Sequence, residues 1–145
     1  MRSFLLIATA ALAAAGPASA SVKQADVTIP ASDGVNLVGD VYLPAAQGKF
    51  PAVVDMEPYG RSSATPFIDA GYAHVNTDVR GSGKSGGALC LLCKREQEDA
   101  YDVVEWIAKQ PWSNGKVALY GYSYSAITSL LGAALQPPHL SLIHI

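Results

Sequence analysis

The sequence is short of charged residues, of cysteine and of any basic run. Its 145 residues include 10 lysines and arginines against 12 aspartates and glutamates, for a net charge of −2. Because the sequence has no cluster of basic residues that could contact phosphates, we do not expect it to bind nucleic acid. The two cysteines are too few for a disulfide scaffold or a four-cysteine zinc site. Apolar residues make up 50% of the chain, which excludes disorder and supplies the core of one domain.

The N-terminus has the three parts of a secretory signal peptide. A positive start, Met1-Arg2, precedes an apolar run over Phe4–Ala15, and Gly16-Pro17 breaks that run. The small residues of Ala18-Ser19-Ala20 then predict a cleavage that removes residues 1–20. An uncleaved membrane anchor is the alternative, but the apolar run is shorter than the roughly 20 residues that span a bilayer. We therefore expect export to the periplasm or out of the cell, without a stable membrane anchor.

Strand and helix patterns alternate after this signal. Apolar and polar residues alternate from Val35 to Leu43, as in a half-buried strand, and apolar residues recur at helical spacing from Glu96 to Lys109. The patterns predict strands at 35–43, 51–56, 72–77 and 116–120 and helices at 96–109 and 125–135. This order favours an α/β fold, in which a mostly parallel sheet carries helices on both faces.

One segment, Gly121-Tyr122-Ser123-Tyr124-Ser125, lies directly between a predicted strand and a predicted helix. A G-x-S-x-G motif in this setting forms a strained turn, the nucleophile elbow, which presents its serine at the carboxyl edge of the sheet. The positions two residues away from the serine must be small. Gly121 meets this requirement, and Ser125 stands where glycine is usual. Ser123 is therefore a candidate nucleophile, with a plain serine-rich turn as the alternative.

A serine nucleophile needs a histidine base that is held by a carboxylate, and in this fold both follow the serine in the chain. The residues after Ser123 include His139 and His144 but no aspartate or glutamate. The predicted helix carries the chain about 16 Å away from the elbow before His139, so we expect His139 in the loop that leads to the next strand. His74, within a predicted strand, is expected to be a packing residue. The triad aspartate and histidine are thus absent from this chain.

Taken in order, the motifs resemble the N-terminal part of the cocaine esterase and X-Pro dipeptidyl-peptidase superfamily of α/β-hydrolases. The resemblance extends over residues 24–140, and no single motif decides it. Besides the elbow, the segments that carry it are 33–37, 40–44, 51–54, 58–60, 71–73, 78–86, 101–106 and 110–115.

The resemblance implies hydrolysis of esters, amides or X-Pro peptides through an acyl-serine, without a metal or an organic cofactor. The substrate would be a small-molecule or peptide acyl compound. The family carries an oxyanion-hole role onto the side chain of Tyr59, and a phenol is a suitable donor. The second donor is expected to be the backbone N–H of Tyr124, the residue after the nucleophile. A packing role is the alternative for Tyr59. The oligomeric state stays open.

The end of the chain departs from the family pattern. Residues 141–145, Ser-Leu-Ile-His-Ile, resemble a translated sequencing adapter more than the next family strand. We therefore expect residues 21–145 to be a partial hydrolase domain that stops before the last strands, with an artefactual stretch of about five residues at its end. The isolated piece would then be catalytically inactive, or a non-enzymatic binding module.

Two further motifs suggest other functions. Gly81-Ser82-Gly83-Lys84-Ser85 looks like a P-loop, but Asp78 stands where a P-loop has its first glycine. We expect a surface loop pinned by Asp78 and Arg80, and nucleotide binding is a distant third alternative.

Cys90 and Cys93 have the spacing of a redox motif. In an exported chain we expect them to form a short-loop disulfide, with two buried free thiols as the alternative.

The predicted signal peptide has a direct test. We expect the exported protein to begin at Ser21, because Ala18-Ser19-Ala20 is the best small-residue cleavage site. Mass spectrometry of secreted material should give a mass that starts at Ser21. Recovery of an intact chain that still begins with Met1 from outside the cell would contradict cleavage.

Overall fold

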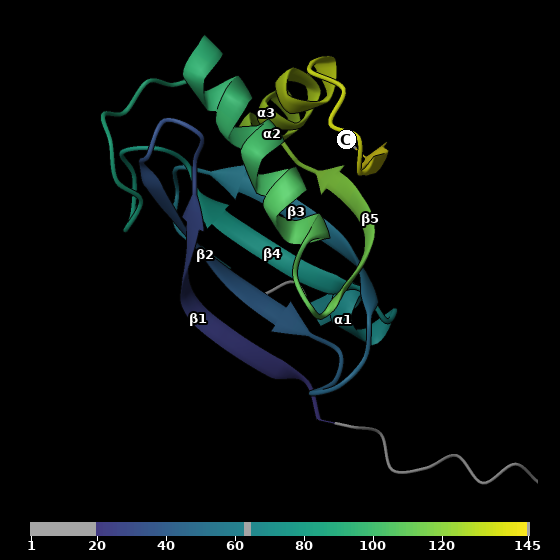
Figure 1. The fold of residues 1–145 in the computed structure, drawn as a ribbon. Coiled ribbons are helices and arrows are strands. Elements are labelled where there is room, and N and C mark those ends of the chain that lie inside the picture. The colour runs from purple at the N-terminus through teal and green to yellow at the C-terminus, as the bar shows by residue number, and fades with distance from the viewer. Residues whose placement is uncertain (1–19, 63–64, 145) are drawn as a thin grey trace, which may run out of the picture.

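The computed structural model describes residues 20–62 and 65–144, so most of the predicted signal peptide lies outside the described residues. These residues form one six-stranded sheet with three helices (Figure 1). The elements are β1 (Val22–Pro30), β2 (Asn36–Leu43), β3 (Phe50–Glu57), α1 (Thr65–Asp69), β4 (Ala73–Asp78), α2 (Lys94–Ala108), β5 (Ser113–Tyr120), α3 (Tyr124–Ala134) and β6 (Leu140–His144). None of the helices in this part of the chain is long and apolar enough to cross a membrane.

The strands lie in the order β1-β2-β4-β3-β5-β6. β3 runs parallel to β4 and β5, and β5 runs parallel to β6. β2 is antiparallel to both β1 and β4. Parallel strands end at the same edge of a sheet, so the loops that follow Glu57, Asp78 and Tyr120 meet at one edge. In open α/β sheets this carboxyl edge is where ligands bind.

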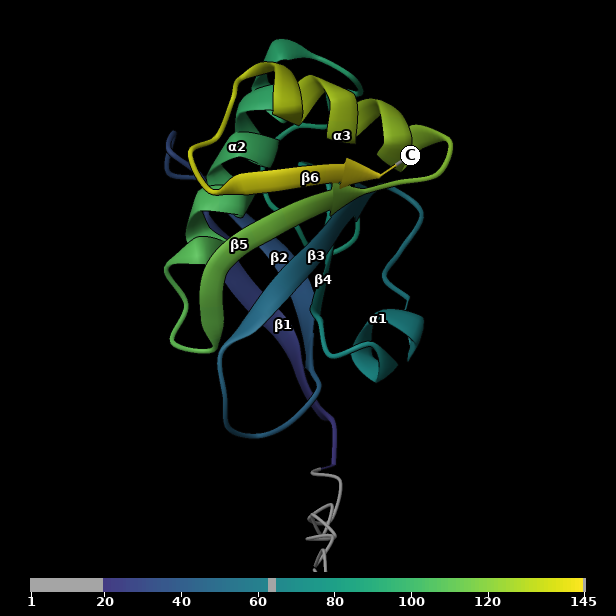
Figure 2. The same ribbon diagram turned by 90° about the vertical axis from the view of Figure 1, so that its right-hand side faces the viewer.

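Helices cover the two faces of the sheet unequally. α2 and α3 lie side by side on one face, and the short α1 lies on the other (Figure 2). On the α1 face, the Phe67 ring packs against two others. Its centroid lies 5.5 Å from that of the His74 ring and 5.0 Å from that of the Tyr120 ring. The main core is the apolar layer between the sheet and α2, and its fully buried residues include Leu37, Val41, Val54, Val75, Val103, Val104, Ile107, Val117 and Leu119. The predicted α/β fold with helices on both faces is confirmed.

Three elements were missed in the sequence analysis. β1 is an edge strand with mostly exposed side chains, so it lacks the alternation that marks a half-buried strand. α1 has only five residues, too few for a helical period. β6 occupies the C-terminal segment that was not expected to continue as a family strand. It pairs with β5, with Leu142 opposite Ala118 and Ile143 opposite Leu119.

The P-loop-like segment is a pinned loop after β4. The carboxylate of Asp78 accepts a hydrogen bond from the backbone N–H of Lys84 at 3.0 Å, and its carbonyl accepts one from the Ser85 hydroxyl at 2.7 Å. Arg80 is buried and donates two hydrogen bonds, of 2.7 and 2.8 Å, to the Asp99 carboxylate of α2. These bonds keep the pKa of Arg80 well above its ordinary value. A carboxylate already occupies a loop N–H that a phosphate would need, which argues against nucleotide binding.

Cys90 and Cys93 lie in the loop between β4 and α2, where the structure joins them as a disulfide. Cys93 is also the residue that precedes the first turn of α2. The loop closed by the disulfide therefore leads directly into α2.

We predict that this disulfide is present in the mature protein, because the export expected from the sequence would place the chain in an oxidising compartment. Titration with a thiol reagent under denaturing, non-reducing conditions should find no free thiol, and prior reduction should release two. Two thiols without reduction would mean that the cysteines stay free.

Candidate active site

The turn between β5 and α3 holds Ser123 in an unusual backbone conformation. Its φ is +57° and its ψ is −115°, in the left-handed half of conformational space that non-glycine residues rarely enter. Ser123 occupies the position before the first turn of α3, its side chain makes no capping hydrogen bond and the residue is exposed. Ser123 is thus exposed at the carboxyl edge of the sheet.

The tightness of this turn depends on Gly121. A Cβ atom at that position would lie 2.1 Å from the carbonyl carbon of Ser125 and 2.3 Å from the nitrogen of Ala126. These neighbours are backbone atoms of α3, so they cannot turn aside as a side chain could. The first position of the motif therefore has to be glycine for the helix to start this close to the strand.

Ser125 fits where glycine is usual, and its hydroxyl has a partner there. Its Oγ accepts a hydrogen bond from the backbone N–H of Tyr122 and donates one to the Tyr122 carbonyl, each at 3.0 Å. One turn further along α3, the Ser129 hydroxyl donates to the carbonyl of Tyr120 at 3.1 Å. Hydroxyl groups on the inner side of α3 thus tie the helix to the turn and to the end of β5.

Tyr59 and Tyr124, the two predicted oxyanion donors, lie together beside the elbow. Tyr59 follows β3, and its side chain is 76% exposed. Tyr124 is the first residue of α3 and is buried. Their ring centroids lie 6.1 Å apart in an edge-to-face arrangement. The Tyr59 hydroxyl is therefore free in the described structure, whereas the Tyr124 side chain points into the protein.

Glu96 is a buried residue of this region that the sequence analysis did not single out. It lies in the first turn of α2 and is 1% exposed. One carboxylate oxygen accepts a hydrogen bond from the Tyr124 hydroxyl at 2.5 Å, and the other accepts one from the backbone N–H of Leu92. Burial raises the pKa of Glu96, and burial together with this hydrogen bond raises the pKa of Tyr124. An acidic residue early in a helix is common, so the sequence carried no signal of this contact.

Arg61 anchors the loop that carries Tyr59. Its guanidinium forms ion pairs with Asp40 at 2.5 Å, Asp26 at 2.7 Å and Asp78 at 3.2 Å. The Arg61 side chain is only 11% exposed, so these pairs are better shielded from water than ordinary surface pairs. The loop after β3 is thereby fixed to β1, β2 and β4.

The comparisons with known proteins agree with this geometry. The family model of the X-Pro dipeptidyl-peptidase (S15) family matches residues 33–145. The chain belongs to the X-Pro dipeptidyl-peptidase (S15) family. It is 33% identical to the cocaine esterase of a Rhodococcus species over 113 residues, which cover 71% of this chain and 20% of that enzyme.

Two solved structures resemble this S15-family chain over most of its length. A CocE/NonD family hydrolase from Staphylococcus aureus superposes with a TM-score of 0.80 at 34% identity, covering 85% of this chain and 27% of that one. An α-amino acid ester hydrolase superposes with a TM-score of 0.76 at 27% identity, covering 91% and 26%. The curated relatives first matched are also longer, and the chain spans 20% to 25% of their length. The chain is therefore a member of a hydrolase family and matches one part of its relatives.

The two C-terminal histidines lie in different places: His139 is away from the elbow, whereas the carbonyl of His144 accepts a hydrogen bond from the N–H of Gly121 at 3.1 Å. His139 lies in the turn before β6, where its Nδ1 is 2.8 Å from a carboxylate oxygen of Glu105 on α2. This is the loop position that the sequence predicts. His144 ends β6 and stacks on Tyr120, with ring centroids 6.0 Å apart. No carboxylate within residues 20–62 and 65–144 hydrogen-bonds to the His144 ring. His74 is a buried core residue, and its Nε2 lies 2.8 Å from Asp55.

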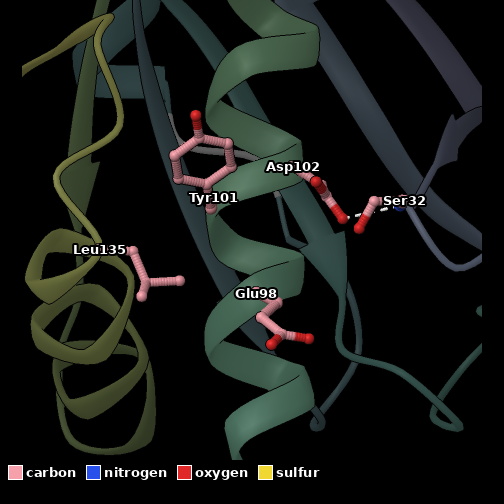
Figure 3. A pocket seen from close by; sticks show the side chains of 5 residues that line it. All are labelled: Ser32, Glu98, Tyr101, Asp102 and Leu135. Carbon is pink, nitrogen blue, oxygen red and sulfur yellow. Dashed lines mark hydrogen bonds between the residues drawn. The ribbon is translucent and has the colours of Figure 1, made fainter.

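The described residues line several cavities, and one of about 280 Å³ includes Tyr120 and His144, beside the elbow. Another, of about 360 Å³, is lined by Ser32, Glu98, Tyr101, Asp102 and Leu135 (Figure 3). Leu135 caps the C-terminal end of α3, whereas Ser123 precedes its first turn, so this 11-residue helix separates the two by about 16 Å. The described part of the chain also contains no group of three or more histidine, cysteine or acidic residues arranged to hold a metal ion.

The close approach at Gly121 predicts a strong effect of a small substitution. Gly121→Ala should lower the free energy of unfolding by about 3 kcal/mol or more, because the new methyl group overlaps the α3 backbone. Gly34→Ala is the control. Its φ of +86° is unfavourable for alanine, but no atom lies within 4 Å of the added Cβ, so it should cost only about 1 kcal/mol. Urea unfolding followed by tryptophan fluorescence measures both, and equal losses would contradict the steric argument.

Proposed function

We propose that this chain is the N-terminal part of an exported serine hydrolase that acts on acyl compounds through an acyl-serine intermediate. The observation that carries the proposal is the backbone of Ser123, held at φ +57° and ψ −115° between β5 and α3 with its side chain exposed. A strained, solvent-facing serine at a strand-to-helix turn is the geometry of an activated nucleophile. Membership of the hydrolase family supports the same chemistry.

The reaction proceeds in two steps in this proposal. The Ser123 Oγ attacks the acyl carbonyl while a base removes its proton, and the tetrahedral oxyanion accepts hydrogen bonds from the Tyr124 N–H and the Tyr59 hydroxyl. The leaving group takes the proton from the base and departs, which leaves the acyl-serine. Water then attacks the ester, the carboxylic acid leaves and the Ser123 hydroxyl is restored.

In this proposal, the histidine base and its carboxylate partner belong to a part of the complete protein outside these 145 residues. The longer length of the relatives supports this view, as does the pairing of His139 with Glu105 away from the elbow. The residues around Ser123 do not distinguish an ester from an amide or an X-Pro peptide, so the proposed substrate class is an acyl compound in general. For the 145 residues taken alone, the second candidate is an inactive α/β piece, because no histidine paired with a carboxylate lies at the elbow among residues 20–62 and 65–144.

Nucleophilic serine chemistry predicts a large loss on one substitution. In the complete protein, translated from the gene past codon 145, Ser123→Ala should lower kcat toward a p-nitrophenyl ester by a factor on the order of 10⁶. Ser125→Ala is the matched control, since it removes only hydrogen bonds to Tyr122. It should cost less than about tenfold. Turnover that survives Ser123→Ala would overturn the proposed function.

The 145-residue chain itself provides a second test. Without a triad base its serine stays protonated at neutral pH, so we expect almost no ester turnover. Ser123→Ala should then change nothing measurable in this chain. An enzymatic rate that Ser123→Ala abolishes would show that a base lies within these residues.

A further inference from the structure

Glu96 is a buried acid that the proposed mechanism does not use. It is 1% exposed, and no lysine or arginine among the described residues pairs with it. The neighbouring Arg95 instead pairs with Glu98, Asp99 and Asp102. Burying a carboxylate without a cation is costly unless hydrogen bonds satisfy its oxygens. The partners of Glu96 therefore indicate what this buried carboxylate does.

The two hydrogen bonds of Glu96 join separate parts of the chain. One oxygen accepts the N–H of Leu92, inside the Cys90–Cys93 loop, and so supports the start of its own helix. The other accepts the Tyr124 hydroxyl at 2.5 Å, across 28 residues of sequence. A role confined to the start of α2 would explain only the first bond. The second bond points to the elbow.

Tyr124 connects this carboxylate to both candidate oxyanion donors. Its own backbone N–H is the proposed first donor, one residue after Ser123. Its ring meets the ring of Tyr59, the proposed second donor, edge to face at 6.1 Å. With the hydroxyl of Tyr124 bound at Glu96, the residue is fixed at both ends, by its side chain in the core and by its backbone in the first turn of α3.

We propose that Glu96 is a positioning residue for the oxyanion hole. Its carboxylate holds the Tyr124 side chain, and Tyr124 in turn sets the direction of its own N–H and supports the Tyr59 ring. This inference rests on the proposed function. The oxyanion exists only in the tetrahedral intermediate and the transition states around it, so a misplaced donor weakens transition-state binding and leaves ground-state binding almost unchanged. The expected signature is a lower kcat with a constant KM.

The test uses Glu96→Gln in the complete protein, with Glu98→Gln as the matched control. Glu98 lies two residues along the same helix, is 35% exposed and pairs with Lys94 and Arg95. Glutamine keeps the size of Glu96 but offers one oxygen where two were used. We expect Glu96→Gln to lower kcat toward a p-nitrophenyl ester about tenfold or more, with KM within about twofold. Glu98→Gln should leave both values unchanged.

Tyr124→Phe probes the same hydrogen bond from its other end and keeps the backbone N–H. It should lower kcat by a similar factor, and the double variant should be little worse than either single one, because residues that act as one unit are not additive. If Glu96→Gln does not fold, Tyr124→Phe with its KM and melting temperature carries the test. A loss of melting temperature with normal kcat, or multiplied effects in the double variant, would overturn the inference.

Ser123→Ala measured in parallel separates the two proposals. If it abolishes turnover while Glu96→Gln and Tyr124→Phe both behave like Glu98→Gln, the proposed function stands and the positioning role is wrong. If Ser123→Ala retains turnover, the proposed function fails, and the role assigned to Glu96 fails with it.

Discussion

The structure depends on the close approach of β5 and α3 at Gly121. With no Cβ at that position, the backbone of Ser125 lies where a side chain would otherwise begin, and the chain reverses from strand to helix within a few residues. The cost of this turn falls on Ser123, which takes a positive φ. Such strain persists only where the surroundings over-determine it. Hydroxyl groups of α3 and the packed sheet below provide those surroundings.

Charged side chains hold the loops around this turn. Arg80 fixes the loop after β4 to α2 through Asp99, and Arg61 fixes the loop after β3 through three aspartates. Glu96 joins α2 to α3 through Tyr124. Each of these groups is largely buried, and a buried charge without its partner is strongly unfavourable. The partners therefore select one arrangement of the loops at the carboxyl edge, where open α/β sheets bind their ligands.

The elements that were predicted and those that were missed differ in how much they bury. β2 alternates in the sequence because Leu37 and Val41 face the core, and α2 shows helical spacing because Val103 and Ile107 do. β1 has no such pattern, since it forms an exposed edge, and α1 is too short to show a period. β6 was unexpected because its residues depart from the family pattern, yet its backbone pairs with β5. Strand pairing uses backbone groups that every sequence offers.

The sequence by itself determined the elbow, because strand, turn and helix are contiguous there and the requirement for a small residue at Gly121 is local. It also indicated the family, through motifs whose order and spacing are visible along the chain. Only the tertiary structure decided which side chains support the elbow. Tyr124 meets Glu96 across 28 residues and Arg61 meets Asp40 across 21. Such contacts arise only when packing brings distant segments together. The sequence around Glu96, an acidic residue near the start of a helix, does not indicate which residue will be its partner.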